Sequence, residues 1–95
     1  MRSGYMYILE CGNGSYYVGS TTNLELRIRQ HQAGVGAKHT AKNLPVELVY
    51  HEFFQEISQA YYREKQVQGW GRMKKLALIE GRLSDLPHLA KGKQT

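Results

Sequence analysis

Positions 5–19 read Tyr5-Met6-Tyr7-Ile8-Leu9-Glu10-Cys11-Gly12-Asn13-Gly14-Ser15-Tyr16-Tyr17-Val18-Gly19. Two runs rich in tyrosine and aliphatic residues, which favour β-strands, flank a short segment with two glycines and an asparagine. Glycine and asparagine accept the left-handed backbone conformations that tight turns require. This stretch therefore predicts a β-hairpin, and the rest of the fold is built outward from it.

The register of this hairpin depends on the length of its turn. A two-residue turn sends Tyr7 and Tyr17 to opposite faces of the sheet. A three-residue loop over 12–14, with its last glycine left-handed in a bulge, pairs Leu9 with Tyr17 and leaves both tyrosines on one face. The sequence permits both turns, and a joint role of the two tyrosines requires the second.

The remaining sequence predicts helices around one further strand. The expected elements are a helix over 23–33, a loop over 34–45, a strand over 46–53, and helices over 58–68 and 72–80. Thr22 and Glu25 have the spacing of a capping box, and Gly34 ends the first helix. Ser58 is the expected cap of the second helix. The predicted order is ββαβαα, which is an α/β fold.

The composition describes one small basic domain. The 95 residues include 13 Lys and Arg against 8 Asp and Glu, a formal net charge of +5, which favours a polyanionic partner. We expect a domain over 1–84 and a flexible tail over 85–95. A single cysteine, Cys11, excludes an intramolecular disulfide and a multi-cysteine zinc site. Because the apolar runs are too short for a signal peptide or a membrane span, we expect a cytoplasmic protein without a membrane partner.

Two helices carry side chains with catalytic chemistry. Glu64 shares a helix face with Ala60 and Val67, at spacings of four and three residues. A carboxylate on that inward face is costly unless it is paired or binds a cation, so structural pairing and magnesium ligation are both open. On the earlier helix, Arg27 and His31 lie one turn apart. They could hold a phosphate and exchange a proton, or form a solvated basic face.

Several enzyme classes lack support in the sequence. A phosphate-binding Gly-x-x-x-x-Gly-Lys-Ser/Thr loop, a His-Glu-x-x-His motif and a Gly-x-Ser-x-Gly elbow are all absent. A two-metal nuclease needs clustered carboxylates, whereas only Glu52 and Glu56 lie close together in this sequence. A phosphoryl-transfer enzyme of this composition would work with one metal ion and cationic side chains.

An ordered set of motifs resembles the GIY-YIG nucleases. Tyr5-Met6-Tyr7 stands where the family has Gly-Ile-Tyr, and Tyr17-Val18-Gly19 matches Tyr-Ile-Gly. Arg27, His31 and Arg63-Glu64 follow in the order that the family shows. No single tripeptide is specific, but the ordered set is.

The resemblance covers residues 5–79 and is closest to the short single-domain bacterial members. Residues 34–40 and 45–50 also resemble the catalytic domain of the eukaryotic structure-specific endonuclease. The sequence departs from the family pattern at two points. Tyr5 replaces the leading glycine of the first tripeptide, and no asparagine follows Asn43, where many members have one.

The resemblance implies a small three-stranded mixed sheet flanked by helices and a divalent-metal-dependent DNA endonuclease that hydrolyses phosphodiester bonds. It implies that Glu64 holds Mg²⁺ or Mn²⁺ and that Tyr7 or Tyr17 activates the attacking water. Arg27 would stabilise charge on the scissile phosphate, and His31 would assist the tyrosine proton or bind phosphate.

Further contacts to DNA are expected from basic side chains around this site. These residues are Lys38, His39, Lys42 and Arg63, with Lys74 or Lys75 in place of the late asparagine. Because the expected elements are all used to build the fold, we expect structure-selective, single-strand or weakly sequence-selective cleavage, or dependence on a protein partner that supplies recognition. DNA repair or recombination is the expected setting. The alternative is a non-cleaving nucleic-acid-binding module that retains the nuclease fold and needs a partner. RNA stays open as a ligand, since nothing in the sequence reads the sugar.

Overall fold

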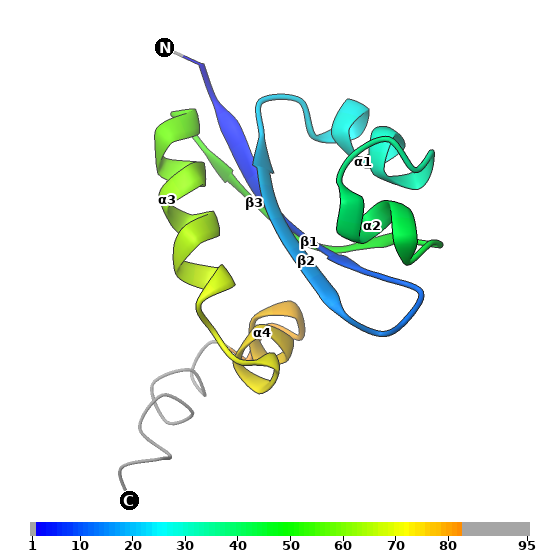
Figure 1. The fold of residues 1–95 in the computed structure, drawn as a ribbon. Coiled ribbons are helices and arrows are strands. Elements are labelled where there is room, and N and C mark those ends of the chain that lie inside the picture. The colour runs from blue at the N-terminus through cyan, green and yellow to red at the C-terminus, as the bar shows by residue number, and fades with distance from the viewer. Residues whose placement is uncertain (1, 83–95) are drawn as a thin grey trace, which may run out of the picture.

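The computed structural model describes residues 2–82, and the chain begins with the expected hairpin (Figure 1). Strand β1 (Gly4–Glu10) pairs antiparallel with β2 (Tyr16–Thr21), and Leu9 lies opposite Tyr17. The three-residue loop is the turn that forms, with Gly14 at a φ of 85°. Tyr7 and Tyr17 therefore lie on the same face of the sheet.

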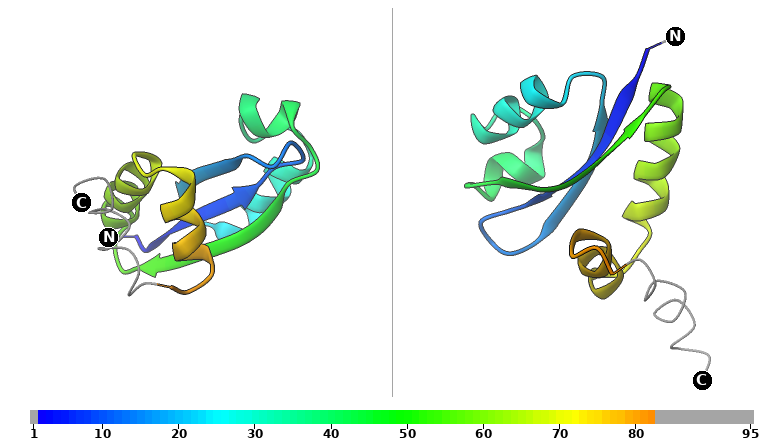
Figure 2. Two further views of the ribbon diagram at one scale, coloured as in Figure 1. Left: turned by 90° about the horizontal axis from the view of Figure 1, so that it is seen from below. Right: turned by 180° about the vertical axis from the view of Figure 1, so that it is seen from behind.

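Strand β3 (Glu47–Phe54) pairs with the other edge of β1, so the sheet order is β2-β1-β3 (Figure 2). Both pairings are antiparallel. The expected mixed sheet is therefore wrong in its strand directions, although the three strands and the α/β class are confirmed. The intervening segment returns the chain to the Glu10 end of β1, where Glu47 is paired, so β3 has to run opposite to β1.

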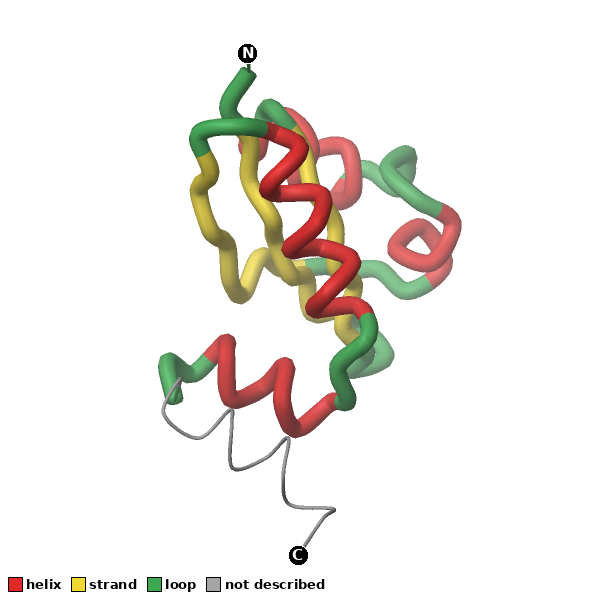
Figure 3. The backbone as a smooth tube through the Cα atoms, turned by 90° about the vertical axis from the view of Figure 1, so that its left-hand side faces the viewer, coloured by secondary structure: helices red, strands yellow, loops and turns green. Residues whose placement is uncertain are grey.

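Four helices flank the sheet. Helix α1 (Leu24–Gln32) packs on one face, and α2 (Lys38–Lys42) packs against α1. Helices α3 (Ile57–Gln68) and α4 (Arg72–Ile79) pack on the other face. Figure 3 shows α3 lying across the strands, with α4 beyond its C-terminal end. The order ββαβαα is confirmed for the larger elements, and the short α2 lies within the segment that was expected to be a loop.

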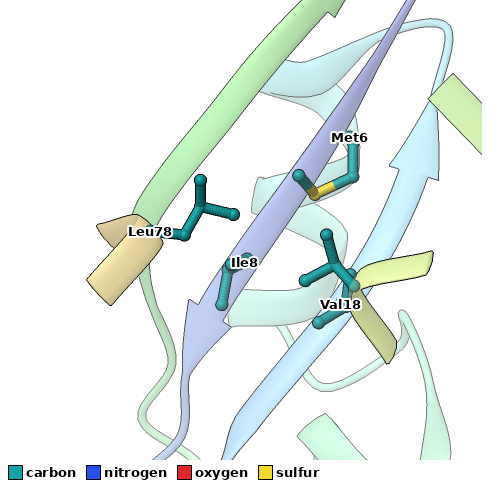
Figure 4. Close-up of a cluster of buried hydrophobic side chains, with 5 residues drawn as sticks. Met6, Ile8, Val18 and Leu78 are labelled. Carbon is teal, nitrogen blue, oxygen red and sulfur yellow. The ribbon is translucent and has the colours of Figure 1, made fainter. Parts of the chain in front are cut away.

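Residues of β1 alternate between two apolar clusters, because successive side chains of a strand point to opposite faces. Met6 and Ile8 pack with Val18, Val67 and Leu78 beneath α3 and α4 (Figure 4). On the opposite face, the second cluster consists of Tyr7, Leu9, Cys11 and Val46, with Leu24 and Ile28 of α1 packed against it. The central strand is thus buried on both sides and fixes the positions of its neighbours.

Two expected helix caps are wrong by one or two residues. Asn23, not Thr22, caps α1, and its Oδ1 accepts the backbone N–H of Leu26 at 3.1 Å. Glu56, not Ser58, caps α3 and forms a reciprocal capping box with Gln59. In both cases a second residue with a suitable acceptor stood nearby, and the path of the chain from the preceding strand selected between them.

Other expectations about the helices are confirmed. Gly34 ends α1 with a φ of 83°, and Glu25 pairs with Arg29 at 3.2 Å on the exposed side of that helix. None of the helices in the described part of the chain has the length and apolar character that a bilayer span requires. The expected tail over 85–95 lies outside the described residues.

Candidate active site

The site is built around Tyr7, which is 1% exposed on the central strand. Its phenol reaches across Gly19, the residue paired with it on the edge strand β2. A Cβ atom at position 19 would collide with the phenol oxygen and the ring of Tyr7. Only glycine at this point of β2 lets the phenol extend toward the open edge of the sheet.

The phenol oxygen of Tyr7 is hydrogen-bonded to the imidazole of His31, which projects inward from α1. The oxygen lies 2.8 Å from Nε2, and the other ring nitrogen, Nδ1, lies 2.8 Å from the hydroxyl of Thr40 in α2. The Thr40 hydroxyl donates to the carbonyl of Ala37 at 3.1 Å. His31 and Thr40 are both fully buried. A continuous hydrogen-bonded chain thus runs from the sheet through α1 to α2.

Burial keeps both groups of this pair neutral. It lowers the pKa of His31 to about 4, with a further contribution from the positive charge of Arg27. Burial also raises the pKa of Tyr7 to about 12. The hydrogen bond and the charge of Arg27 lower this pKa, whereas Tyr17 and the carboxylate of Glu64 raise it. At neutral pH the pair is therefore a phenol and an uncharged imidazole.

The low pKa of His31 makes the protein less stable in acid. Between pH 6.5 and pH 4 the unfolded chain binds a proton at this residue and the folded chain does not, so the free energy of unfolding falls as the pH falls. The expected loss through His31 is up to about 3 kcal/mol. Urea titrations at pH 7.5, 6.0, 5.0 and 4.5 measure it.

The control for this measurement is a second histidine variant. His31→Gln should remove most of the pH dependence across this window, whereas His39→Gln, at an exposed position of α2, should leave it in place. Equal pH dependence in the wild type and in His31→Gln would contradict the assignment.

Arg27 lies on α1 one turn before His31, half-buried beside the same phenol. Its Nη1 donates to Oε1 of Gln30 and its Nη2 to the carbonyl of Gly36, each at 3.1 Å. A guanidinium carries five N–H donors, so these two bonds fix its orientation and leave others for a ligand. Arg27 and His31 are thus turned to the same patch, as their spacing predicted.

Glu64 approaches the same edge of the sheet from the opposite face. Its side chain is 13% exposed, and it accepts hydrogen bonds from Ser20 Oγ at 2.5 Å and from Gln68 Nε2 at 2.7 Å. Its ionic contact within residues 2–82 is with the adjacent Lys65, at 3.7 Å. Ala60 and Val67 on the same helix face are fully buried. Within the described residues the partners of this carboxylate are therefore two neutral side chains and a neighbouring lysine.

The carboxylate of Glu64 is a ligand that suits one hard divalent cation. Within residues 2–82, no group of three or more His, Cys, Asp or Glu side chains could enclose a metal ion. Magnesium is commonly held by one or two carboxylates and keeps several of its waters. Two neutral donors orient the Glu64 carboxylate, whose four lone-pair positions leave room for such an ion.

Tyr17 and His39 extend the site toward α2. The ring of Tyr17 lies 5.2 Å from that of His31 and is stacked on that of His39, with ring centroids 6.4 Å apart. His39 Nε2 is also 2.8 Å from Ser15 Oγ. Lys38 and Lys42 are exposed on the same short helix. The structure thus brings the expected DNA-contact segment next to the tyrosine pair.

The structure does not bring Arg63 to the Glu64 carboxylate. Arg63 turns toward β3, pairs with Glu52 at 2.9 Å, and lies 5.2 Å from the centroid of the Trp70 ring. Lys74 lies over the same ring at 4.4 Å. Neighbouring helix positions diverge by about 100°, which separates Arg63 from Glu64. Lys75 is half-buried on α4.

Four residues around the site were not singled out from the sequence. They are Ser20, Gly36, Thr40 and Gln68. Ser20 and Gln68 hold the Glu64 carboxylate. A Cβ atom at Gly36 would collide with the imidazole of His31, so this glycine lets the loop close over the ring. The spacing of Gln68, four residues after Glu64, was a usable signal. The others depend on contacts between distant segments.

Comparison with known proteins matches residues 3–77 to the model of the GIY-YIG catalytic domain. The chain belongs to the GIY-YIG catalytic domain family. The resemblance drawn from the two tripeptides and the residues that follow them is therefore confirmed. This is a family of nucleases, whose members typically use divalent metal ions.

The relatives of this GIY-YIG chain include short proteins that carry the name UPF0213. One from Staphylococcus haemolyticus is 46% identical over 82 residues, which covers 86% of this chain and 100% of the relative. One from Haloquadratum walsbyi is 46% identical over 76 residues, covering 80% of this chain and 85% of the relative. The expected likeness to the short single-domain bacterial type is confirmed.

Two solution NMR structures share the fold of this GIY-YIG domain. The UPF0213 protein BH0048 from Bacillus halodurans is 40% identical, with a TM-score of 0.54 over 82% of this chain and 83% of that chain. The protein EF2693 from E. faecalis is 34% identical, with a TM-score of 0.57 over 85% of this chain and 86% of that chain.

Proposed function

We propose that this chain is a magnesium-dependent DNA endonuclease that hydrolyses phosphodiester bonds at the open edge of β2. The observation that carries the proposal is the hydrogen bond between the phenol of Tyr7 and His31, close to the charges of Arg27 and Glu64. Arg27 and Glu64 both shift the pKa of that phenol by their charges. Phosphoryl chemistry needs such a combination of a proton acceptor, a cation and a metal-holding carboxylate.

Water activation is assigned to Tyr7 together with His31. A phenolate at neutral pH is disfavoured, because burial raises the pKa of Tyr7 to about 12. The neutral imidazole, 2.8 Å from the phenol oxygen, can take the phenol proton only transiently, because its own pKa is about 4. As the phenol takes a proton from water, it can pass its own proton to Nε2, so that no free phenolate has to form. Tyr17 then has a positioning role between His31 and α2.

Arg27 and Glu64 are assigned to the phosphate. The guanidinium, held by Gln30 and Gly36, retains donors for the non-bridging oxygens, which gain charge as water attacks. Glu64 would hold Mg²⁺ or Mn²⁺, and Ser20 would keep its carboxylate in position. When bound, the ion supplies positive charge that offsets the negative charge of the scissile phosphate.

The substrate is proposed to be selected by its structure or by a weak sequence preference. Reading base edges requires an element inserted into a groove, whereas the helices and strands of residues 2–82 pack into the two apolar clusters or support the site. The basic side chains Lys38 and Lys42 would contact phosphates, so binding should weaken strongly with salt. A protein partner would supply further recognition, in repair or recombination, and RNA is a second nucleic acid to test.

The test is cleavage of end-labelled duplex, flap, branched and single-stranded DNA, and of RNA, with Mg²⁺, Mn²⁺ or EDTA. We expect metal-dependent cutting that differs among DNA structures more than among sequences. Binding without cutting in every metal would overturn the nuclease proposal and favour the non-cleaving nucleic-acid-binding module. Tight protection of one defined sequence by this chain alone would contradict the proposed selectivity.

A further inference from the structure

Thr40 is the last polar side chain in the hydrogen-bonded chain that starts at Tyr7, and a backbone carbonyl lies within reach of its hydroxyl proton. Its hydroxyl donates to the carbonyl of Ala37 at 3.1 Å. That carbonyl also accepts the backbone N–H of Ala41 at 2.9 Å, in the first turn of α2. A carbonyl cannot donate, so the direction of the bond from Thr40 is fixed.

The direction of that bond decides which nitrogen of His31 carries hydrogen. A hydroxyl has one proton, so toward Nδ1 of His31, at 2.8 Å, Thr40 can only accept. While the hydroxyl donates to Ala37, Nδ1 has to be the N–H of the ring. In an uncharged imidazole Nε2 is then bare, and its hydrogen bond with the Tyr7 hydroxyl has the phenol as donor.

The surroundings leave His31 no other partner at Nδ1. The ring and Thr40 are fully buried, and the backbone of Gly36 is packed so closely against the Nδ1 side of the ring that a Cβ there would collide with it. In the part of the chain that the structure describes, every buried side-chain nitrogen and oxygen has a hydrogen-bond partner. In the opposite tautomer the Thr40 hydroxyl would have to turn its proton to Nδ1 and give up its hydrogen bond to the carbonyl of Ala37.

We propose that Thr40 is a positioning residue that fixes His31 as the Nδ1–H tautomer and thereby orients the hydroxyl of Tyr7 toward Nε2. The consequence for catalysis rests on the proposed nuclease function. With its proton directed to His31, the phenol oxygen keeps its lone pairs for the proton of an attacking water. In the opposite tautomer, Nε2–H would donate to the phenol and occupy that oxygen.

The tautomer can be measured without any nuclease activity. In ¹⁵N NMR spectra of the labelled protein at pH 7.5, the protonated and bare nitrogens of a neutral imidazole have distinct chemical shifts. We expect His31 to be Nδ1–H in the wild type and in Thr40→Ser, and to shift toward Nε2–H in Thr40→Val. Thr22→Val, in the segment between β2 and α1, is the matched control and should leave the His31 signals unchanged.

Cleavage rates provide the second readout. Thr40→Val should lower kcat by about 10- to 100-fold, whereas Thr40→Ser retains most of it. An Nε2–H ring in the wild type would overturn the inference whatever the activity. This measurement uses the wild-type protein alone, so it does not depend on whether a variant folds. An Nδ1–H ring in a protein that cuts no substrate would instead uphold the role of Thr40 and overturn the proposed function.

Discussion

Replacing Glu64 by glutamine is expected to lower the cleavage rate by about 1,000-fold, equivalent to about 4 kcal/mol of transition-state stabilisation. Glutamine has the same shape and can still accept the hydrogen bond that Ser20 donates at 2.5 Å. What it lacks is the negative charge, and the carboxylate of Glu64 is the group at the site that suits a magnesium ion. The variant should therefore lose metal-dependent cutting while it keeps its fold.

The matched control is Glu25→Gln. Glu25 is an exposed carboxylate that pairs with Arg29 on the outer side of α1, so its loss removes one charge from the protein without touching the site. We would measure cleavage of the preferred DNA substrate by the wild type and both variants over a range of Mg²⁺ concentrations. Thermal melts of the same three proteins would show whether each keeps its fold. A Glu64→Gln enzyme that cuts as fast as Glu25→Gln would exclude Glu64 as the metal ligand.

The hairpin and the buried face of α3 could be predicted because their signals are local. Strand-forming residues on both sides of a glycine-rich segment define the hairpin, and a left-handed Gly14 agrees with its three-residue loop. Ala60 and Val67 repeat at helical spacing around Glu64, and both are fully buried as expected. In each case the pattern lies within about a dozen residues, where backbone geometry alone relates one side chain to the next.

The direction of β3 and the existence of α2 could not be predicted in this way. Glu47 pairs with Glu10 across 37 positions of sequence, and nothing in either strand states the direction of the pairing. Helix α2 has five residues, too few for a periodic signal. Its Thr40 contacts His31 of α1, and this contact between separate segments cannot be read from the local sequence.

The sequence suggested candidate site residues, but not the hydrogen bonds that connect them in the structure. The ordered motifs indicated Tyr7 and Glu64, yet the partners that orient them are Thr40, through His31, and Ser20. Arg63 was expected to contact DNA, but its guanidinium pairs with Glu52 of β3, so DNA would have to compete with that carboxylate. Serine, threonine and glycine are common residues. Their role at the site can be recognised only from their contacts with a distant segment of the chain.

Tyr7→Phe is expected to lower the cleavage rate by about 100- to 10,000-fold, the range that loss of a general base produces. The phenyl ring fits over Gly19 as the phenol does, so the change removes the oxygen and little else. It also leaves Nε2 of the fully buried His31 without its partner. We therefore expect the free energy of unfolding to fall by about 1–3 kcal/mol, which a urea titration measures.

Tyr17→Phe distinguishes the two tyrosines. If Tyr7 passes its proton to His31, the Tyr17 variant should lose far less activity, because its ring, 5.2 Å from that of His31, can still pack between the imidazole and α2. The control is Tyr16→Phe, which removes a phenol oxygen from β2 at a position outside the site. The ring of Tyr16 lies beneath the guanidinium of Arg72, at 4.4 Å. A larger loss in Tyr17→Phe than in Tyr7→Phe would transfer water activation to Tyr17, and the buried phenol–imidazole pair would then stabilise the fold without taking part in proton transfer.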